Sequence, residues 1–128
     1  MWGIDEGVEV SALYHHLVGE LDKLRLAYLH IMHSGTEELL ADIRKLWRQT
    51  LIINRPGRPR YEVGADIATG LADLESYGQM VLANPDLINR LKFGAPMNEA
   101  DRSTYFGGTE KGFTDYPTLA DAAAEEGV

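Results

Sequence analysis

The sequence contains no cysteine. Disulfides, cysteine-based zinc sites and thiol nucleophiles are therefore all excluded. Positive charges are also few, because 12 Lys and Arg face 20 Asp and Glu, which gives a formal net charge of −8. Proteins that bind the nucleic-acid backbone depend on an excess of Lys and Arg. Nucleic acid is therefore not an expected partner.

Long apolar runs are missing as well. No stretch approaches the roughly 18 apolar residues that a membrane-spanning helix needs, so no membrane partner is expected. The opening segment MWGIDEGVEV is acidic and lacks the basic start and apolar centre of a signal peptide. The expected location is the cytoplasm.

What the sequence does contain is the composition and the periodicity of one globular domain, with 45% hydrophobic residues in 128. The spacing of apolar residues predicts alternating helices and short strands. Helices are predicted over residues 9–24, 34–47, 61–70 and 85–94, and strands over residues 26–33, 50–54 and 71–78. The second helix begins either with a capping box from Ser34 to Glu37 or with Thr36 as the N-cap. The last helix is predicted to begin with Asn84 as the N-cap and Pro85 at the first helical position.

Alternation of this kind predicts an α/β fold, and the nearly all-apolar strands are typical of parallel strands covered on both faces. The pattern alone fits a piece of a (β/α)8 barrel or a piece of a doubly wound sheet. The polar, glycine-rich segment after residue 94 is predicted to be irregular. Residues 120–128 are predicted to form a flexible tail.

Three segments resemble the C-terminal part of the Old Yellow Enzyme family, the FMN-dependent NAD(P)H alkene reductases that fold as a (β/α)8 barrel. They are LAYLHIMH at 26–33, LADLESYGQMVLANPDLINRLKFGAPMNEADRSTYFGG at 71–108 and GFTDYPTL at 112–119. The resemblance covers residues 10–119. It implies that residues 1–119 are the C-terminal part of a flavin-binding barrel, with strands six to eight and without the first five.

The resemblance also implies a site for the FMN phosphate after the last two strands, where barrels often hold phosphate. Gly78 matches the family's strand-eight glycine, which lets an anion approach the backbone. Gln79 stands where the family usually has an arginine. The preceding loop, residues 54–58, brings cations that could replace that arginine, or it is simply a solvated basic loop. The residues expected to bind the cofactor are Asn54, Arg55, Gly57, Arg58, Tyr77, Gly78 and Gln79.

No catalytic residue is expected, because the resemblance places the family's catalytic groups in the strands that this chain lacks. Phe113 is expected at the substrate rim, with packing of the C-terminal segment as the alternative. No metal site is expected, because His30 and His33 are three residues apart on a strand and face opposite sides.

Three functions remain open. In the first, the chain is part of an oxidoreductase that passes hydride from NADPH or NADH through FMN to a small activated alkene. In the second, it is a non-catalytic truncated or split product that is vestigial or needs a complementary barrel fragment. In the third, it is a binding module that keeps the phosphate site but has lost the chemistry. Cutting a barrel bares interior side chains such as Tyr28 and Ile52, so self-association or a complementary fragment is expected.

Overall fold

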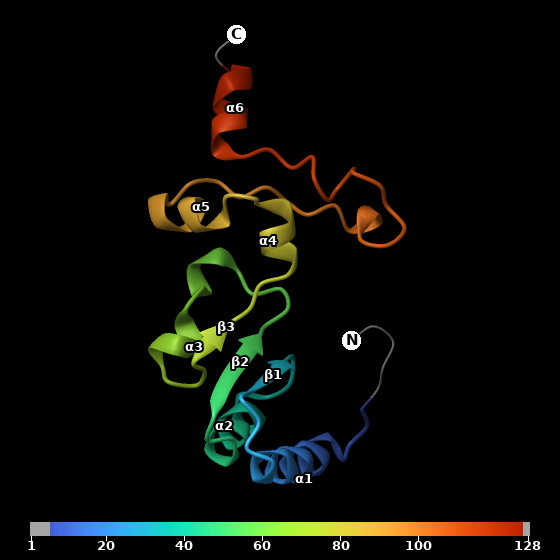
Figure 1. The fold of residues 1–128 in the computed structure, drawn as a ribbon, viewed down its shortest axis with the longest axis vertical. Coiled ribbons are helices and arrows are strands. Elements are labelled where there is room, and N and C mark those ends of the chain that lie inside the picture. Colours follow the sequence, from blue (N-terminus) through green and yellow to red (C-terminus); the bar gives the residue numbers. More distant parts are fainter. Residues whose placement is uncertain (1–5, 127–128) are drawn as a thin grey trace. The chain divides into compact units, whose positions relative to one another are not determined.

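The structure is a computed structural model that describes residues 6–126. The chain separates into two compact units, Met1–Ser76 and Tyr77–Val128. Each unit is described by itself below, and the element labels are those of Figure 1. No helix within residues 6–126 combines the length and the hydrophobicity needed to cross a membrane.

The first unit contains a three-stranded sheet with the order β1-β2-β3. All strand pairs are parallel, as the sequence predicts. The elements in chain order are α1 (Val10–Lys23), β1 (Tyr28–Met32), α2 (Glu37–Leu46), β2 (Thr50–Asn54), the short 3-10 helix η1 (Arg60–Glu62), α3 (Ala65–Ala68) and β3 (Leu74–Glu75). The predicted alternation of helices and strands is therefore confirmed in this unit (Figure 1).

The third strand is much shorter than the predicted 71–78, because its first residues are held elsewhere. The backbone N–H groups of Leu71 and Ala72 donate to the carbonyl oxygen of Asp66 at 2.9 and 3.1 Å. The carboxylate of Asp73 accepts a hydrogen bond from the Leu51 N–H at 2.8 Å. Backbone and side-chain bonds thus replace the regular ladder at the start of β3.

Local signals explain where the helices of this unit begin and break. Thr36, and not Ser34, is the N-cap of α2, since its side-chain oxygen accepts from the Leu39 N–H at 3.3 Å. The helix predicted over 61–70 is divided into η1 and α3. Gly64 lies between them in the left-handed region with φ +84°, which interrupts a continuous helix.

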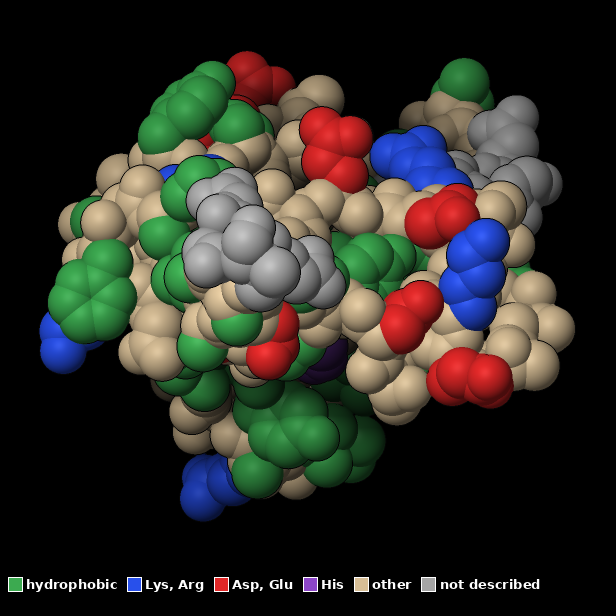
Figure 2. Space-filling model, turned by 90° about the horizontal axis from the view of Figure 1, so that it is seen from above, with side chains coloured by type: hydrophobic (Ala, Val, Ile, Leu, Met, Phe, Trp, Pro, Cys, Tyr) green, Lys and Arg blue, Asp and Glu red, His purple; other side chains and the backbone are tan. Residues whose placement is uncertain are grey.

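One face of the sheet packs against α1 and α2 and forms the core. Its fully buried members are Val18, Leu40, Ile43, Trp47, Leu51 and Ile53. The opposite face is open: Tyr28, Met32 and Leu74 are 57%, 56% and 50% exposed, and Ile52 is half-buried. Exposed hydrophobic side chains are also visible beside charged ones on the surface shown in Figure 2. The predicted baring of this sheet face is confirmed.

The second unit consists of short helices joined by irregular segments. They are α4 (Gln79–Ala83), α5 (Leu87–Phe93), the 3-10 helix η2 (Arg102–Thr104) and α6 (Leu119–Glu126). The prediction of Asn84 as an N-cap is wrong, because residues 79–83 already form a helix and Asn84 ends it. Its side-chain amide donates to the Met80 carbonyl at 2.9 Å. Gly94 ends α5 with φ +67°, as predicted.

The segment predicted as a flexible tail contains α6, and residues 127–128 lie outside the described part of the chain. Helix formation by residues 119–126 was not predicted. The flexibility of the segment is a separate property and stays a prediction.

Buried Arg90 orders the irregular part of the second unit. It is 3% exposed and donates to the carboxylate of Asp86 at 2.6 Å. It also donates to the carbonyl oxygens of Pro96 and Pro117 at 2.7 and 2.8 Å. Asn98 donates to the same Pro117 oxygen at 2.8 Å. These bonds satisfy backbone groups that no regular element pairs.

Candidate functional site

The candidate site begins at the carboxyl edge of the sheet, where β2 ends at Asn54 and β3 ends at Glu75. Because the strands are parallel, both ends lie at the same edge. The Asn54 side-chain amide donates to the carbonyl oxygen of Ser76 at 2.8 Å, which ties the two strand ends together. The loop over residues 54–58 starts from this point.

Gly57 lies at the exposed tip of this loop, with φ +75°. No heavy atom lies within 4 Å of the position that a Cβ would occupy there. The left-handed conformation explains the glycine. The open surroundings leave the backbone at the tip accessible to a ligand.

Arg55 is engaged with two carboxylates. Its Nε and Nη2 donate to the two oxygens of Asp66, both at 2.9 Å. Its Nη1 and Nη2 both donate to the carboxylate of Glu37, the latter at 2.9 Å. The hydrogen bond to Glu37 is the main reason why the pKa of Arg55 is raised. All three nitrogen atoms of this guanidinium group therefore have partners.

Arg58 is more deeply buried, with a side chain that is 9% exposed. Its Nη1 lies 3.0 Å from Asp66 Oδ2 and 3.1 Å from Glu75 Oε1. Its Nε lies 3.4 Å from Glu62 Oε2. Glu75 in turn accepts from the Gly64 N–H at 2.6 Å and from the Asp66 N–H at 2.8 Å. Arg58 thereby joins β3 to the turn before α3.

Asp66 is the centre of this ion-pair cluster, which we define as Glu37, Arg55, Arg58, Glu62, Asp66 and Glu75. The Asp66 residue is 3% exposed. Burial raises the pKa of its carboxyl group, but the hydrogen bonds from Arg55 and Arg58 outweigh burial and leave the pKa below its usual value. Within the cluster, four carboxylates surround two guanidinium groups. The guanidinium groups as paired here do not fit the role of free phosphate ligands.

Tyr77, Gly78 and Gln79 are the first residues of the second unit. Gly78 has φ −83° and no heavy atom within 4 Å of a Cβ built on it. Neither its conformation nor its packing therefore demands glycine. Gln79 is the exposed first residue of α4, and Tyr77 is half-buried.

Phe113, also in the second unit, is 44% exposed. A Cβ added at Gly108 would lie 3.6 Å from the Phe113 ring. The ring therefore packs against the backbone of the glycine-rich loop. Packing of this segment onto the barrel, the alternative interpretation of Phe113, stays a prediction.

The two histidines of the β1 segment have separate partners. His30 Nε2 lies 2.7 Å from the Ser76 hydroxyl oxygen, and His33 Nε2 lies 3.0 Å from the Thr36 carbonyl oxygen. Within residues 6–126, no cluster of three or more His, Asp or Glu is placed to hold a metal ion.

Sequence reasoning missed the carboxylates that hold Arg55 and Arg58. The partners Glu37 and Glu75 are 18 and 17 residues away from the arginines that they bind. Glu62 and Asp66, which follow the Arg-rich loop within eight residues of Arg58, gave a usable signal. Acidic residues so close to arginines in the sequence are natural partners for them.

The chain matches no family model. It is 39% identical over 112 residues to a 12-oxophytodienoate reductase-like protein from Solanum lycopersicum, which covers 85% of this chain and 31% of the relative. It is 41% identical over 116 residues to 12-oxophytodienoate reductase 1 from Oryza sativa subsp. japonica, covering 88% of this chain and 28% of the relative.

Solved structures give the same result. Morphinone reductase in complex with tetrahydroNAD superposes with a TM-score of 0.76 and 36% identity, over 91% of this chain and 32% of that one. The old yellow enzyme from Trypanosoma cruzi superposes with a TM-score of 0.76 and 31% identity, over 88% and 31%. The chain thus spans about a third of the length of the proteins it matches. It belongs to the Old Yellow Enzyme family and corresponds to part of that family's (β/α)8 barrel.

Proposed function

We propose that the chain is the C-terminal part of a cytoplasmic FMN-dependent NAD(P)H:alkene oxidoreductase and contributes the FMN-phosphate end of the flavin site. The observation that carries this proposal is the shared carboxyl edge of β2 and β3, where Asn54 donates to the Ser76 carbonyl. In (β/α)8 barrels this edge carries the active site, and its last loops often hold phosphate.

Within this proposal, FMN supplies the redox chemistry by which hydride from NADPH or NADH reaches an activated alkene. The residues of this chain bind and orient. Gly57 and Gly78 present open backbone to the phosphate, because nothing occupies the space beside either glycine. Gln79 offers a neutral amide donor. Tyr77 lies beside these residues in the sequence and belongs to the same proposed site.

Arg55 and Arg58 contribute in this proposal by holding the loop of residues 54–58. Their N–H groups donate to carboxylates, and both side chains are largely buried, at 14% and 9% exposure. A phosphate that took either guanidinium group would have to displace a carboxylate. Phe113 belongs to the proposed substrate rim, supported by its partial exposure.

Replacing Gln79 by Arg is expected to tighten FMN binding by about tenfold. Hydrogen bonds to charged groups contribute about 1.5–3 kcal/mol, against about 0.5–1.5 kcal/mol for neutral ones. A gain of about 1.4 kcal/mol corresponds to a factor of ten. The dissociation constant is measured by quenching of flavin fluorescence on titration with the protein.

Gln49→Arg is the matched control. Gln49 is also exposed, but it lies just before β2 at the amino edge of the sheet. The Gln49→Arg variant adds the same charge at the other end of the strand from the proposed site. It should leave FMN affinity within about twofold of that of the unmodified chain, because a single distant charge is screened by salt. Equal gains from both variants, or no FMN binding by either, would contradict the phosphate site.

A second function is favoured by the exposed sheet face of Tyr28, Met32 and Leu74. In this alternative the chain is a non-catalytic product that needs a complementary barrel fragment, or a second copy of itself, to cover that face. Apolar patches of this kind on soluble proteins mark interaction sites.

The purified chain, supplied with FMN, NADPH and an activated alkene, is expected to show no turnover in either case. Catalysis requires reductant, flavin and substrate to be held in one geometry. About two thirds of the length of the related enzymes has no counterpart in this chain. NADPH oxidation is followed by absorbance against a control without protein. A rate clearly above that control, dependent on FMN, contradicts the expectation.

A further inference from the structure

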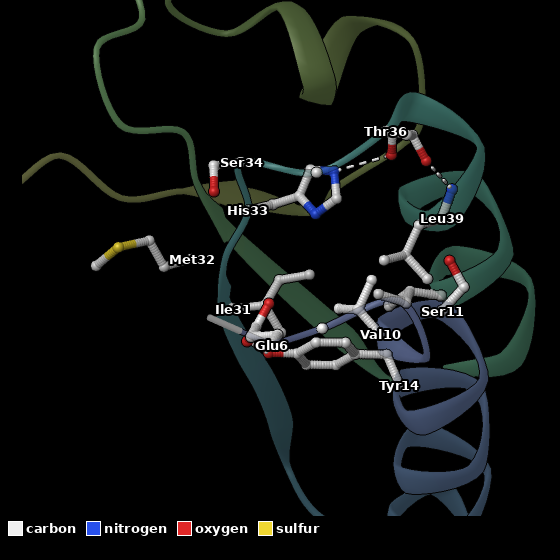
Figure 3. Close-up of a pocket in the computed structure, with 13 residues that line it drawn as sticks. Glu6, Val10, Ser11, Tyr14, Ile31, Met32, His33, Ser34, Thr36 and Leu39 are labelled. Carbon is white, nitrogen blue, oxygen red and sulfur yellow. Dashed lines mark hydrogen bonds between the residues drawn. The ribbon is translucent and has the colours of Figure 1, made fainter. Parts of the chain in front are cut away.

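A cavity of about 300 Å³ opens at the carboxyl end of β1, within the first unit. Its walls come from the start of α1, the end of β1, the loop that follows β1 and the first turns of α2 (Figure 3). Val10, Ile31, Leu39 and Ile43 form the apolar part of its lining, and polar residues such as Ser11, Ser34 and Thr36 form the rest. The volume lies at the lower end of the roughly 300–1,000 Å³ typical of small-molecule sites.

His33 brings an unused hydrogen-bond acceptor to this cavity. The residue is 7% exposed, and its Nε2 lies 3.0 Å from the Thr36 carbonyl oxygen. A carbonyl only accepts, so Nε2 carries the hydrogen, and in this tautomer Nδ1 has a lone pair. No residue within 6–126 donates a hydrogen bond to that Nδ1.

The orientation of the imidazole ring is fixed. A Cβ added at Gly35 would lie only 3.1 Å from His33 Cε1, so the glycine backbone packs closely on the ring. In Figure 3 the ring lies between Thr36 and the space bordered by Ile31 and Val10. His33 Nδ1 has no donor among the described residues and is open to the cavity, so an N–H group of a ligand can take the place of water there.

Charges around the cavity select against anions. Glu6 is the acidic residue of the lining. The Tyr14 hydroxyl donates to Glu6 at 2.5 Å. That hydrogen bond, together with burial, raises the pKa of Tyr14 and keeps the phenol protonated. The apolar walls in turn disfavour a desolvated cation.

We propose that this cavity binds a small, uncharged ring compound with an apolar body and a single N–H donor, which bonds to His33 Nδ1. The site uses residues of α1, β1 and α2, and none of those assigned to the flavin phosphate. It is therefore independent of the proposed function.

Indole is the probe, and 1-methylindole is the matched compound that lacks only the N–H. Both are titrated into the full chain, with binding followed by calorimetry. Indole should bind about tenfold more tightly, because 1-methylindole displaces water from His33 Nδ1 and leaves that acceptor unpaired. Equal affinities for the two compounds, or no heat from indole at millimolar concentration, would overturn the proposal.

Two variants on neighbouring positions of α1 test the location. Ser11 lines the cavity, whereas Ala12 does not, and both are exposed. Ser11→Leu should weaken indole binding at least fivefold by filling the cavity, and Ala12→Leu should leave it unchanged. Neither change disturbs a buried residue, so both chains should fold. An unchanged affinity of Ser11→Leu for indole would show that indole does not bind in this cavity and would overturn the assignment.

Discussion

Replacing Asp66 by Asn is expected to lower the free energy of unfolding by about 3–5 kcal/mol, the cost of breaking a buried ion pair by removing one partner. Asp66 is 3% exposed and receives hydrogen bonds from both Arg55 and Arg58. The neutral amide leaves two largely buried guanidinium groups without their central counter-charge. Urea denaturation followed by circular dichroism measures the change.

Asp42→Asn is the control for this substitution. Asp42 makes comparable contacts, with Lys45 at 2.9 Å and His15 at 3.2 Å, but its side chain is 40% exposed. Exposed ion pairs of this kind contribute about 0–1 kcal/mol. A loss in Asp66→Asn no larger than the loss in Asp42→Asn would show that the ion-pair cluster does not hold the loop.

The pH dependence provides a second readout for Asp66. Its pKa is lower in the folded chain than in the unfolded chain, so the folded state binds fewer protons. The stability that Asp66 contributes is therefore present above the unfolded pKa of about 3.9 and is lost as the pH falls through the folded pKa. The difference in the free energy of unfolding between the unmodified chain and Asp66→Asn should accordingly be constant near neutrality and shrink below about pH 4.

The parts of the fold that the sequence predicts are those set by local signals. The strands at Tyr28–Met32 and Thr50–Asn54 are short apolar runs between helices, and the structure pairs them in parallel. Thr36 was one of two possible caps, and the choice depended on hydrogen-bond geometry that the letters do not contain. Helix α4 was missed because its run of five residues is as apolar as a strand.

The candidate site was less predictable because its contacts join distant residues. Arg55, Arg58 and Arg60 lie within six residues of an otherwise acidic chain, which suggested that one of them binds a phosphate. In the structure, Arg55 and Arg58 form ion pairs with Glu37, Asp66 and Glu75. These carboxylates lie in α2, α3 and β3. No local pattern shows that these elements meet at one loop, because the partners Glu37 and Glu75 lie 18 and 17 residues from the arginines that they bind. The role of the arginines in phosphate binding stays a prediction.

Trp47 lies where the two predictable elements of the first unit meet, directly after α2 and before β2. It is completely buried, at 0% exposure, in the core between the helices and the sheet. Its indole N–H donates to the carbonyl oxygen of Thr50 at 2.8 Å, which fixes the turn into β2. The side chain thus combines the largest volume in the core with a hydrogen bond to the start of the central strand.

Trp47→Ala is expected to lower the free energy of unfolding by about 3–5 kcal/mol. The substitution loses the transfer free energy of the buried side chain and also leaves a cavity in the core. Since small domains are stable by about 5–15 kcal/mol, the variant should be largely unfolded at moderate urea concentrations. Tyr61→Ala is the control, because Tyr61 is 86% exposed and its loss should change stability by no more than about 0.5 kcal/mol. Trp47→Phe keeps most of the volume and should fall between the two, by losing the N–H bond. Circular dichroism is the readout, since the substitution removes one of the two tryptophans and with it the fluorescence of the core. Equal midpoints for Trp47→Ala and Tyr61→Ala would mean that the sheet and its helices do not form the cooperative core described above.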